Sequence, residues 1–183
     1  WHNDEGFKNS YLVQHPGYYL TGDAGYRDDD GYFYVMSRID DIINVAGHRL
    51  STGSIEETLS GHPDVAECAV IGAADEMKGE VPVGFVVLKA GVTRAHGEVV
   101  AELVESVRTT IGAFACFKTA LVVKALPKKG WGKILGGTMK KIPDGVEYNL
   151  PATIEDPAVL QDIGAEPKPA GYPGAGAAGS QTR

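Results

Sequence analysis

Lysine residues gather around a glycine-rich loop in the last third of the sequence. Lys133 directly follows this loop, residues 130–132. An ammonium group on a flexible loop can neutralise negative charge that develops in a transition state. Taken alone, the cluster is more typical of a solvated basic helix. Its members are Lys124, Lys128, Lys129, Lys133, Lys140 and Lys141.

Three further polar residues with chemical potential lie near the N-terminus. Asp23 follows Thr-Gly in a tight turn, where its carboxylate can accept both hydroxyls of a ribose. The alternative for Asp23 is a structural Asx-type turn. Arg38 carries a planar guanidinium suited to ribose or phosphate. Asp40 lies where the composition changes, and by itself indicates only a solvated acidic junction.

The pattern of apolar residues divides the chain into three segments. Residues 1–38 are rich in aromatic and turn residues, and Asp30-Gly31 between two strand-like runs predicts a hairpin. This segment has too few aliphatic residues for a core, so we interpret it as the edge of a larger, missing domain. Residues 39–142 form the main domain. Residues 143–183 form a tail that we expect to be disordered from about residue 164.

The sequence of the main domain predicts an α+β fold, and we expect this domain to fold without the preceding segment. Apolar runs indicate a strand at 42–45 and central strands at 65–71, 81–88 and 121–123. Three helices are predicted. The first is short, begins at a capping box formed by Ser54 and Glu57 and ends at residue 59. The second covers residues 98–111, and the third runs from about 133 to 142. This order implies a small three-stranded antiparallel or mixed sheet with helices on one face, plus a β-hairpin.

The composition excludes several classes of function. A net charge of −7 gives no general reason to expect nucleic acid or a membrane as partner, and no apolar run approaches a membrane span. The five histidines are scattered, so no metal site is expected. Two cysteines predict reduced thiols in a reducing compartment. The start at Trp1 without a methionine or signal peptide is what we expect of a fragment.

A longer string of residues resembles a known family. Thr-Gly-Asp at 21–23 is followed, from Arg38, by Arg-x-Asp-Asp-x-Ile-x-Val-x-Gly-x-Arg. This combination resembles the adenylate-forming superfamily. Residues 47–52 and 55–57 resemble its acetyl- and propionyl-CoA synthetase branch. The resemblance runs from Trp1 to about Pro157, and it implies that the chain is the C-terminal part of such a synthetase with its mobile lid domain.

The resemblance implies roles for the nucleotide and hinge residues. Asp23 would bind the ribose hydroxyls, and Arg38 would contact the same ribose or its phosphates. Asp40 falls at the hinge about which the C-terminal domain rotates between the two half-reactions. Lys133 would be the adenylation lysine, because residues 127–133 resemble the family loop Pro-Lys-Thr-x-Ser-Gly-Lys. Here Lys129 replaces the usual Thr and Trp131 the usual Ser.

The same resemblance implies a surface for coenzyme A. Gly47 and Arg49 match positions that line the thioester-forming conformation, where Gly47 leaves room for the pantetheine arm. Arg108 matches a position that meets the CoA nucleotide, whereas by itself it is a solvated helix arginine.

The implied activity is that of an AMP-forming, short-chain acyl-CoA ligase acting on a small carboxylate, ATP and CoA. Mg²⁺ is expected mainly in the missing N-terminal domain, without which this chain would be inactive. The phosphate loop and the acyl pocket of the family lie upstream. The alternatives are an adenylation domain that serves a carrier protein and a non-catalytic nucleotide- or CoA-binding module. We expect a cytoplasmic location, with mitochondria as the alternative.

Overall fold

The computed structural model describes residues 2–130, 132–142, 150 and 152–165. The chain divides into two compact units, Trp1–Asp41 and Ile42–Arg183. None of the helices in the described ranges has both the length and the apolar character of a membrane-spanning segment.

The first unit contains one helix and one β-hairpin. Helix α1 (Asp4–Tyr11) was not predicted, although its cap is readable: the Asn3 side chain accepts a hydrogen bond from the Gly6 amide at 2.9 Å. Strands β1 (Asp23–Arg27) and β2 (Phe33–Arg38) pair antiparallel, which confirms the predicted hairpin. The short 3-10 helix η1 (Ile39–Asp41) follows. No described side chain of this unit is fully buried.

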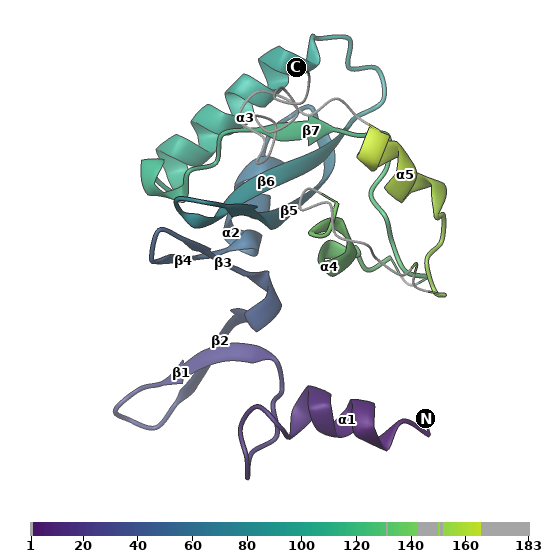
Figure 1. Cartoon of the computed structure of the whole chain (residues 1–183). Helices are drawn as coiled ribbons and strands as arrows, with labels where there is room; N and C mark the ends of the chain where they lie inside the picture. The colour runs from purple at the N-terminus through teal and green to yellow at the C-terminus, as the bar shows by residue number, and fades with distance from the viewer. Residues whose placement is uncertain (1, 131, 143–149, 151, 166–183) are drawn as a thin grey trace, which may run out of the picture. The chain divides into compact units, whose positions relative to one another are not determined.

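The second unit is an α+β domain, as predicted (Figure 1). In its described part β6 pairs antiparallel along its length with β5, at Gly79 with β3, and in parallel with β7, while β3 and β4 form a hairpin. The elements are β3 (Ile42–Val45), β4 (His48–Ser51), α2 (Thr52–Ser60), β5 (Val65–Asp75), β6 (Gly79–Leu88), α3 (His96–Thr110), η2 (Ala113–Ala115), β7 (Ala120–Val122), α4 (Gly136–Met139) and α5 (Ala158–Ala165).

Both faces of the sheet are covered, so the prediction of helices on one face was wrong. One apolar cluster packs α2 and α3 against the sheet, with Leu59, Leu103 and Val107 in its centre. A second cluster packs α4 and α5 against the other face, where Met139 and Leu160 are completely buried. The uninterrupted apolar runs of β5 and β6 indicate that both faces of these strands are buried. A strand with one face in solvent would alternate apolar and polar residues.

Two helix boundaries differ from the predictions. Helix α2 begins at Thr52 after Ser51, so Ser54 lies inside the helix and forms no capping box; its carbonyl accepts from the Thr58 hydroxyl at 3.0 Å. The last predicted helix shrinks to α4, because Lys128 and Ile134 form a β-bridge and hold the residues before α4 in a loop. Helix α3 is confirmed, and it buries Val99 one turn before Leu103. Beyond Ala165 the predicted disorder falls outside the described residues.

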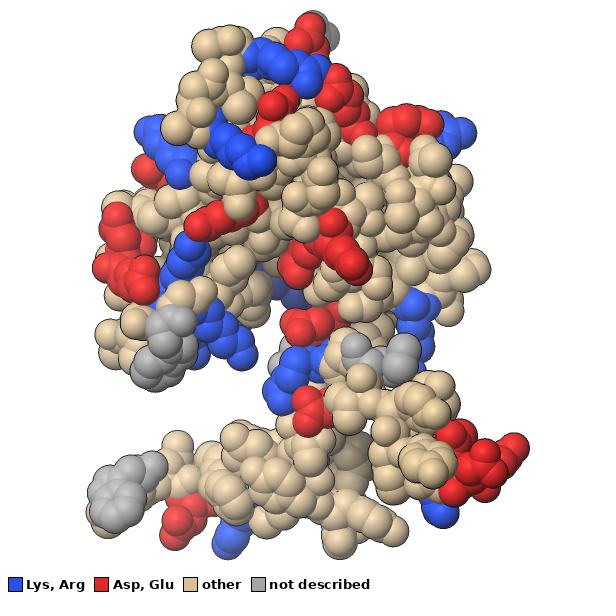
Figure 2. Space-filling model, turned by 180° about the vertical axis from the view of Figure 1, so that it is seen from behind, with Lys and Arg blue, Asp and Glu red and all other residues tan. Residues whose placement is uncertain are grey.

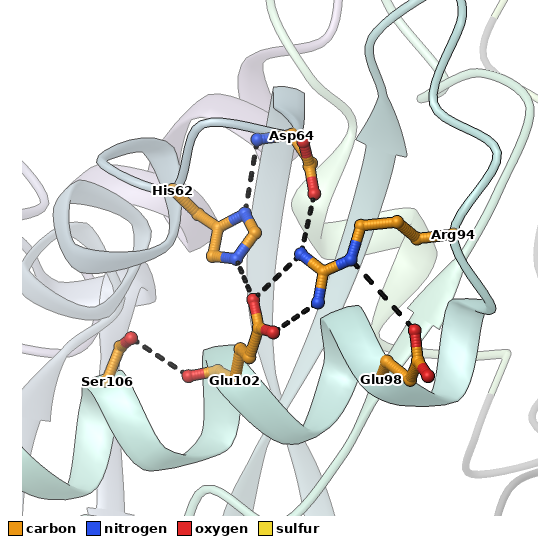
Figure 3. A network of polar contacts seen from close by, with 6 residues as sticks. All are labelled: His62, Asp64, Arg94, Glu98, Glu102 and Ser106. Atoms are coloured by element: carbon orange, nitrogen blue, oxygen red, sulfur yellow. Dashed lines mark hydrogen bonds and ion pairs between the residues drawn. The ribbon is translucent and has the colours of Figure 1, made fainter.

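A polar network ties the α2–β5 loop to α3 (Figure 3). The Arg94 guanidinium donates to Asp64 at 3.1 Å and forms an ion pair with Glu102. His62 Nδ1 accepts from the Asp64 amide at 3.2 Å, so its Nε2 carries the proton that it donates to Glu102 at 2.9 Å. Glu98 contacts Arg94 only at 4.0 Å. The network lies on one edge of the α3 layer and orients that helix.

Candidate functional site

Asp23 and Arg38, predicted to bind a nucleotide, lie side by side. Asp23 begins β1 and Arg38 ends β2, and the strand register places the two residues opposite each other. Arg38 Nη1 lies 3.5 Å from Asp23 Oδ1 and donates to the carbonyl of Thr21 at 2.9 Å. The two side chains are 44% and 47% exposed. A carboxylate acceptor and a cationic donor therefore face solvent together, which suits a ribose that carries a phosphate.

The turn before Asp23 requires glycine. Gly22 has a φ of +80°, and a Cβ atom on it would lie 2.6 Å from an Arg38 guanidinium nitrogen. The turn is closed by the Thr21 hydroxyl, which accepts from the Asp23 amide at 3.2 Å. The Asp23 carboxylate is thus not the turn acceptor that an Asx-type turn would need. Its exposed oxygens leave it available for a ligand.

Asp40, the predicted hinge residue, lies in η1 at the end of the first unit. Only its backbone is described, and this forms a single turn of 3-10 helix between β2 and β3. The Ile39 amide donates to the carbonyl of Gly22 at 2.8 Å, so the turn starts from the base of the β1–β2 hairpin. The next residue, Asp41, is the last of the unit.

Gly47 and Arg49 belong to the β3–β4 hairpin. Ala46 and Gly47 form its two-residue turn, and both have positive φ, +49° and +88°. This is the conformation that the twist of a tight hairpin favours, and it explains the glycine. A Cβ atom on Gly47 would meet nothing within 4 Å, so the turn is open to a ligand. Arg49 is exposed on β4, opposite Asn44.

Arg108 lies on the last turns of α3 and is exposed. The ring of Phe114, in the η2 turn that follows α3, lies 5.4 Å from the ring of His48 at the start of β4. This contact brings the tip of the hairpin to the end of α3 that carries Arg108. The structure thus gathers the three residues predicted for CoA on neighbouring elements.

Lys133 lies in a loop that is held at both ends. The Lys129 amide donates to the carbonyl of Lys133 at 2.8 Å, and the Leu135 amide donates to Pro127 at 2.9 Å. The side chain of Lys133 is exposed, and it has no hydrogen bond or ion pair within the described ranges. In Figure 1 α4, which directly follows this loop, lies away from the tip of the β3–β4 hairpin. Trp131 lies outside the described residues.

Two neighbouring lysines of the same cluster are neutralised. Lys128 Nζ lies 2.7 Å from Glu67 Oε1 on β5, and Lys140 forms an ion pair with Glu80 on β6. These two lysines fasten the segment to the sheet, which is a structural task. On the face shown in Figure 2, acidic and basic side chains are mixed, with no continuous basic surface. Lys133 is therefore set apart from Lys128 and Lys140 because no described residue acts as its counter-ion, rather than by the sign of its surroundings.

Among the described residues no three His, Cys, Asp or Glu side chains are arranged to hold a metal ion. Both cysteines are free thiols and half-buried. Cys68 Sγ contacts the carbonyl of Glu56 at 3.3 Å, and burial, together with the charge of Glu56, raises its pKa to about 11. Cys68 is thus a poor nucleophile at neutral pH.

Comparison with known proteins places this geometry in a family. Residues 54–133 match the family described as AMP-binding enzyme C-terminal domain. The chain is 54% identical over 164 residues to acyl-CoA synthetase short-chain family member B, mitochondrial, from Dictyostelium discoideum, covering 90% of this chain and 24% of the relative. It is 48% identical over 163 residues to the human acyl-CoA synthetase short-chain family member 3, mitochondrial, covering 89% and 24%.

The fold has a solved counterpart. The crystal structure of ATP-bound MatB from Rhodopseudomonas palustris superposes with a TM-score of 0.61 at 26% identity, covering 77% of this chain and 27% of that protein. The chain spans about a quarter of the length of the curated relatives that it matches. The region that matches the family lies within the second unit. It ends at Lys133, which the sequence analysis gave as the candidate catalytic lysine. Residues 54–133 therefore carry the C-terminal domain of the AMP-binding enzymes, and the relatives of this chain include short-chain acyl-CoA synthetases.

Proposed function

We propose that this chain is the lid portion of an AMP-forming acyl-CoA ligase of the acetate/propionate type. The reaction joins a small carboxylate to CoA with ATP, through an acyl-adenylate, and yields AMP and pyrophosphate. The relatives are about four times as long as this chain, so the proposal assigns the acyl pocket and the phosphate loop to the rest of the enzyme. The chain by itself would be inactive.

The domain limits follow from the same proposal. Residues 1–38 are the edge of the large AMP-binding domain, residues 39–142 are the C-terminal domain, and residues 143–183 are a tail. The division of the chain after Asp41 and the exposed aromatic residues of the first unit support the first limit. Helix α5 lies in the tail and packs in the second cluster. This supports the proposal that the first part of the tail belongs to the folded domain.

Lys133 is proposed as the adenylation lysine. The observation that carries this is an exposed ammonium that has no counter-ion among the described residues. It lies on a loop held by backbone hydrogen bonds, whereas the neighbouring Lys128 and Lys140 are neutralised. An unpaired cation is free to stabilise the charge that develops as the carboxylate attacks the α-phosphate. Afterwards it can withdraw with the domain.

Asp23 and Arg38 are proposed to hold the nucleotide. The Asp23 carboxylate would accept from both ribose hydroxyls, and Arg38, already anchored on the Thr21 carbonyl, would contact the ribose or its phosphates. Mg²⁺ is proposed to bind mainly in the rest of the enzyme, and no step here depends on it.

Gly47, Arg49 and Arg108 are proposed to meet CoA in the second half-reaction. The open Ala46-Gly47 turn would admit the pantetheine arm, and the two exposed arginines would meet the phosphates of the nucleotide. Asp40 is the proposed pivot between the two conformations. The proposed location is the cytoplasm, with mitochondria as the alternative, because the relatives from Dictyostelium discoideum and human are named as mitochondrial proteins. Neither nucleic acid nor a membrane is among the proposed partners.

The test measures the two half-reactions separately in the full-length enzyme. Carboxylate-dependent exchange of pyrophosphate into ATP reports adenylation, and synthetic acyl-adenylate plus CoA reports thioester formation. Lys133→Ala should lower the exchange rate by about 10²–10³-fold, because one charge-stabilising contact in a dry site contributes on the order of 3–4 kcal/mol. Thioester formation should stay near normal.

Lys141→Ala is the matched control, because Lys141 is exposed on the same segment. Intact exchange in Lys133→Ala would refute the assignment and make Lys129 the next candidate. Transfer of the acyl group to a carrier protein, but not to CoA, would favour a carrier-dependent adenylation domain instead. Binding of nucleotide or CoA with neither half-reaction would indicate a non-catalytic module.

A further inference from the structure

The loop that carries Lys133 is paired along its outer edge with a distant part of the chain. The Gly130 amide donates to the carbonyl of Thr153 at 3.2 Å, and the Glu155 amide donates to the carbonyl of Lys128 at 3.0 Å. These bonds flank a β-bridge between Lys129 and Ile154. The matched family ends at Lys133, so the pairing segment lies outside it.

This segment is anchored independently of the loop. Ile154 packs against the second apolar cluster, and helix α5 directly after it places Leu160 and Ile163 in that cluster, 0% and 3% exposed. The cluster also contains residues on each side of the loop, Leu126 before it and Ile134 after it. The segment therefore connects the loop to the sheet through the partly buried Ile154 and, through the chain that follows, the fully buried side chains of α5.

The two arms of the loop are held by different contacts, and the pairing with residues 153–155 explains the difference. Its first arm, at Lys128 and Lys129, is fixed to β5 by the Lys128–Glu67 ion pair and to residues 153–155 by main-chain hydrogen bonds. Its second arm carries Lys133, and the main-chain hydrogen bonds of its described residues run to the first arm and to Pro127 before it: the Lys129 amide donates to Lys133, the Gly132 amide to Lys129 and the Leu135 amide to Pro127. Ordering a glycine-rich backbone costs about 1–2 kcal/mol per residue. A paired first arm supplies a fixed template on which the second arm can form.

We propose that residues 153–155, anchored by α5, are a positioning element that holds the Lys133 loop in its working geometry. The inference rests on the proposed function of Lys133 and deepens it. Residues 153–155 do not touch the reacting groups; they act through the backbone of Lys128 and Gly130. The element should therefore affect the step that uses Lys133 and leave the thioester step unchanged.

Glu155 provides a matched pair of variants. Glu155→Pro removes the amide that donates to Lys128, while Glu155→Ala keeps that amide and removes only an exposed side chain. Proline also favours an extended residue before it, which suits the β-bridge of Ile154. In the full-length enzyme, Glu155→Pro should lower carboxylate-dependent pyrophosphate exchange roughly five- to tenfold, mainly in kcat, as expected for the loss of one hydrogen bond. Glu155→Ala should retain the wild-type rate.

Ile154 provides a second pair that does not depend on proline. Ile154→Ala should lower the exchange rate, and the conservative Ile154→Val should restore most of it, because valine keeps the branched contact with the cluster. In both pairs the rate of thioester formation from synthetic acyl-adenylate should stay constant. Equal losses in the two half-reactions would overturn the proposal, since they would indicate general damage to the fold.

Amide hydrogen exchange tests the coupling without any activity. In this chain, Glu155→Pro should accelerate the exchange of the Gly130 and Lys129 amides by roughly five- to tenfold, while amides in the β5–β6 ladder remain protected. Unchanged protection of Gly130 and Lys129 would overturn the proposal. A wild-type enzyme with no pyrophosphate exchange would instead overturn the proposed function, and the coupling would then be decided by amide exchange alone.

Discussion

The carboxylate of Glu80 on β6 accepts a hydrogen bond from the ammonium of Lys140, directly after α4. Its other oxygen accepts from the Asn44 amide on β3 at 3.1 Å. Burial raises the pKa of Glu80, but the hydrogen bonds from Lys140 and Asn44 and the charge of Lys140 together outweigh it and lower the pKa. One side chain thus joins the β3–β4 hairpin to the helix that follows Lys133.

The Glu80–Lys140 contact predicts a measurable coupling. A double-mutant cycle with Glu80→Gln and Lys140→Met should give a coupling free energy of about 1 kcal/mol for unfolding, because both groups are only partly shielded from water. Chemical denaturation of the four proteins measures it at neutral pH. Lys141→Met, paired with Glu80→Gln, is the control and should give no coupling. A cycle that closes to zero for Lys140 would show that the contact contributes nothing.

The Arg94–Glu102 ion pair predicts a loss of stability in acid. Hydrogen bonds, first from Arg94 and then from His62, lower the pKa of Glu102 from 4.5 to about 2. Because the pKa is lower in the folded chain, this contribution is present above pH 4.5 and is lost as the pH falls towards 2. Glu102→Gln should flatten that part of the profile of unfolding free energy against pH. Glu98→Gln, at the longer contact, should leave the profile unchanged, and salt should weaken the effect.

The position of Asp40 predicts a selective defect in domain rotation. Asp40→Pro fixes φ near −65°, a value that one turn of 3-10 helix tolerates but that a pivot must leave. In the full-length enzyme, thioester formation should fall several-fold more than pyrophosphate exchange. Asp40→Ala, which leaves φ free, serves as the control. Parallel loss of both half-reactions in Asp40→Pro would show that Asp40 is not the pivot.

The turn of the β3–β4 hairpin predicts opposite effects for two neighbouring substitutions. Ala46 has a φ of +49°, so Ala46→Gly should raise the free energy of unfolding by up to about 1 kcal/mol. Gly47, at +88°, should show the reverse, and Gly47→Ala should lower it by about 1 kcal/mol. Urea denaturation of the 183-residue chain measures both changes. A destabilised Ala46→Gly variant would contradict the strain assigned to the turn.

The burial of helix α5 predicts that the folded domain extends beyond residue 142. Leu160 is completely buried against the second face of the sheet, so Leu160→Ala should cost about 2–5 kcal/mol of unfolding free energy. Gln161→Ala changes an exposed residue of the same helix and should cost less than about 0.5 kcal/mol. Thermal or urea unfolding of the whole chain compares the two. Equal, small effects would show that α5 is not part of the cooperative core.

The sequence alone determined the elements whose residues carry a local or periodic signal. Strand β3, helix α3 and the β1–β2 hairpin were predicted near their observed limits, because an apolar period or an Asp-Gly turn is written in neighbouring residues. The same holds for the family, since the string from Arg38 to Arg49 is contiguous. The candidate site residues were all named at this stage, although their roles stay predictions.

Only the tertiary structure decided how those residues are held. The opposition of Asp23 and Arg38 depends on strand register, and the pairing of Ile154 with Lys129 joins residues 25 positions apart in the sequence. Helix α5 is short, and its burial depends on an uncovered face of a sheet formed far upstream. The helix predicted from about 133 to 142 begins only at Gly136 in α4, because the β-bridge between Lys128 and Ile134 holds the preceding residues in a loop, where tertiary contacts outweigh a local helical preference.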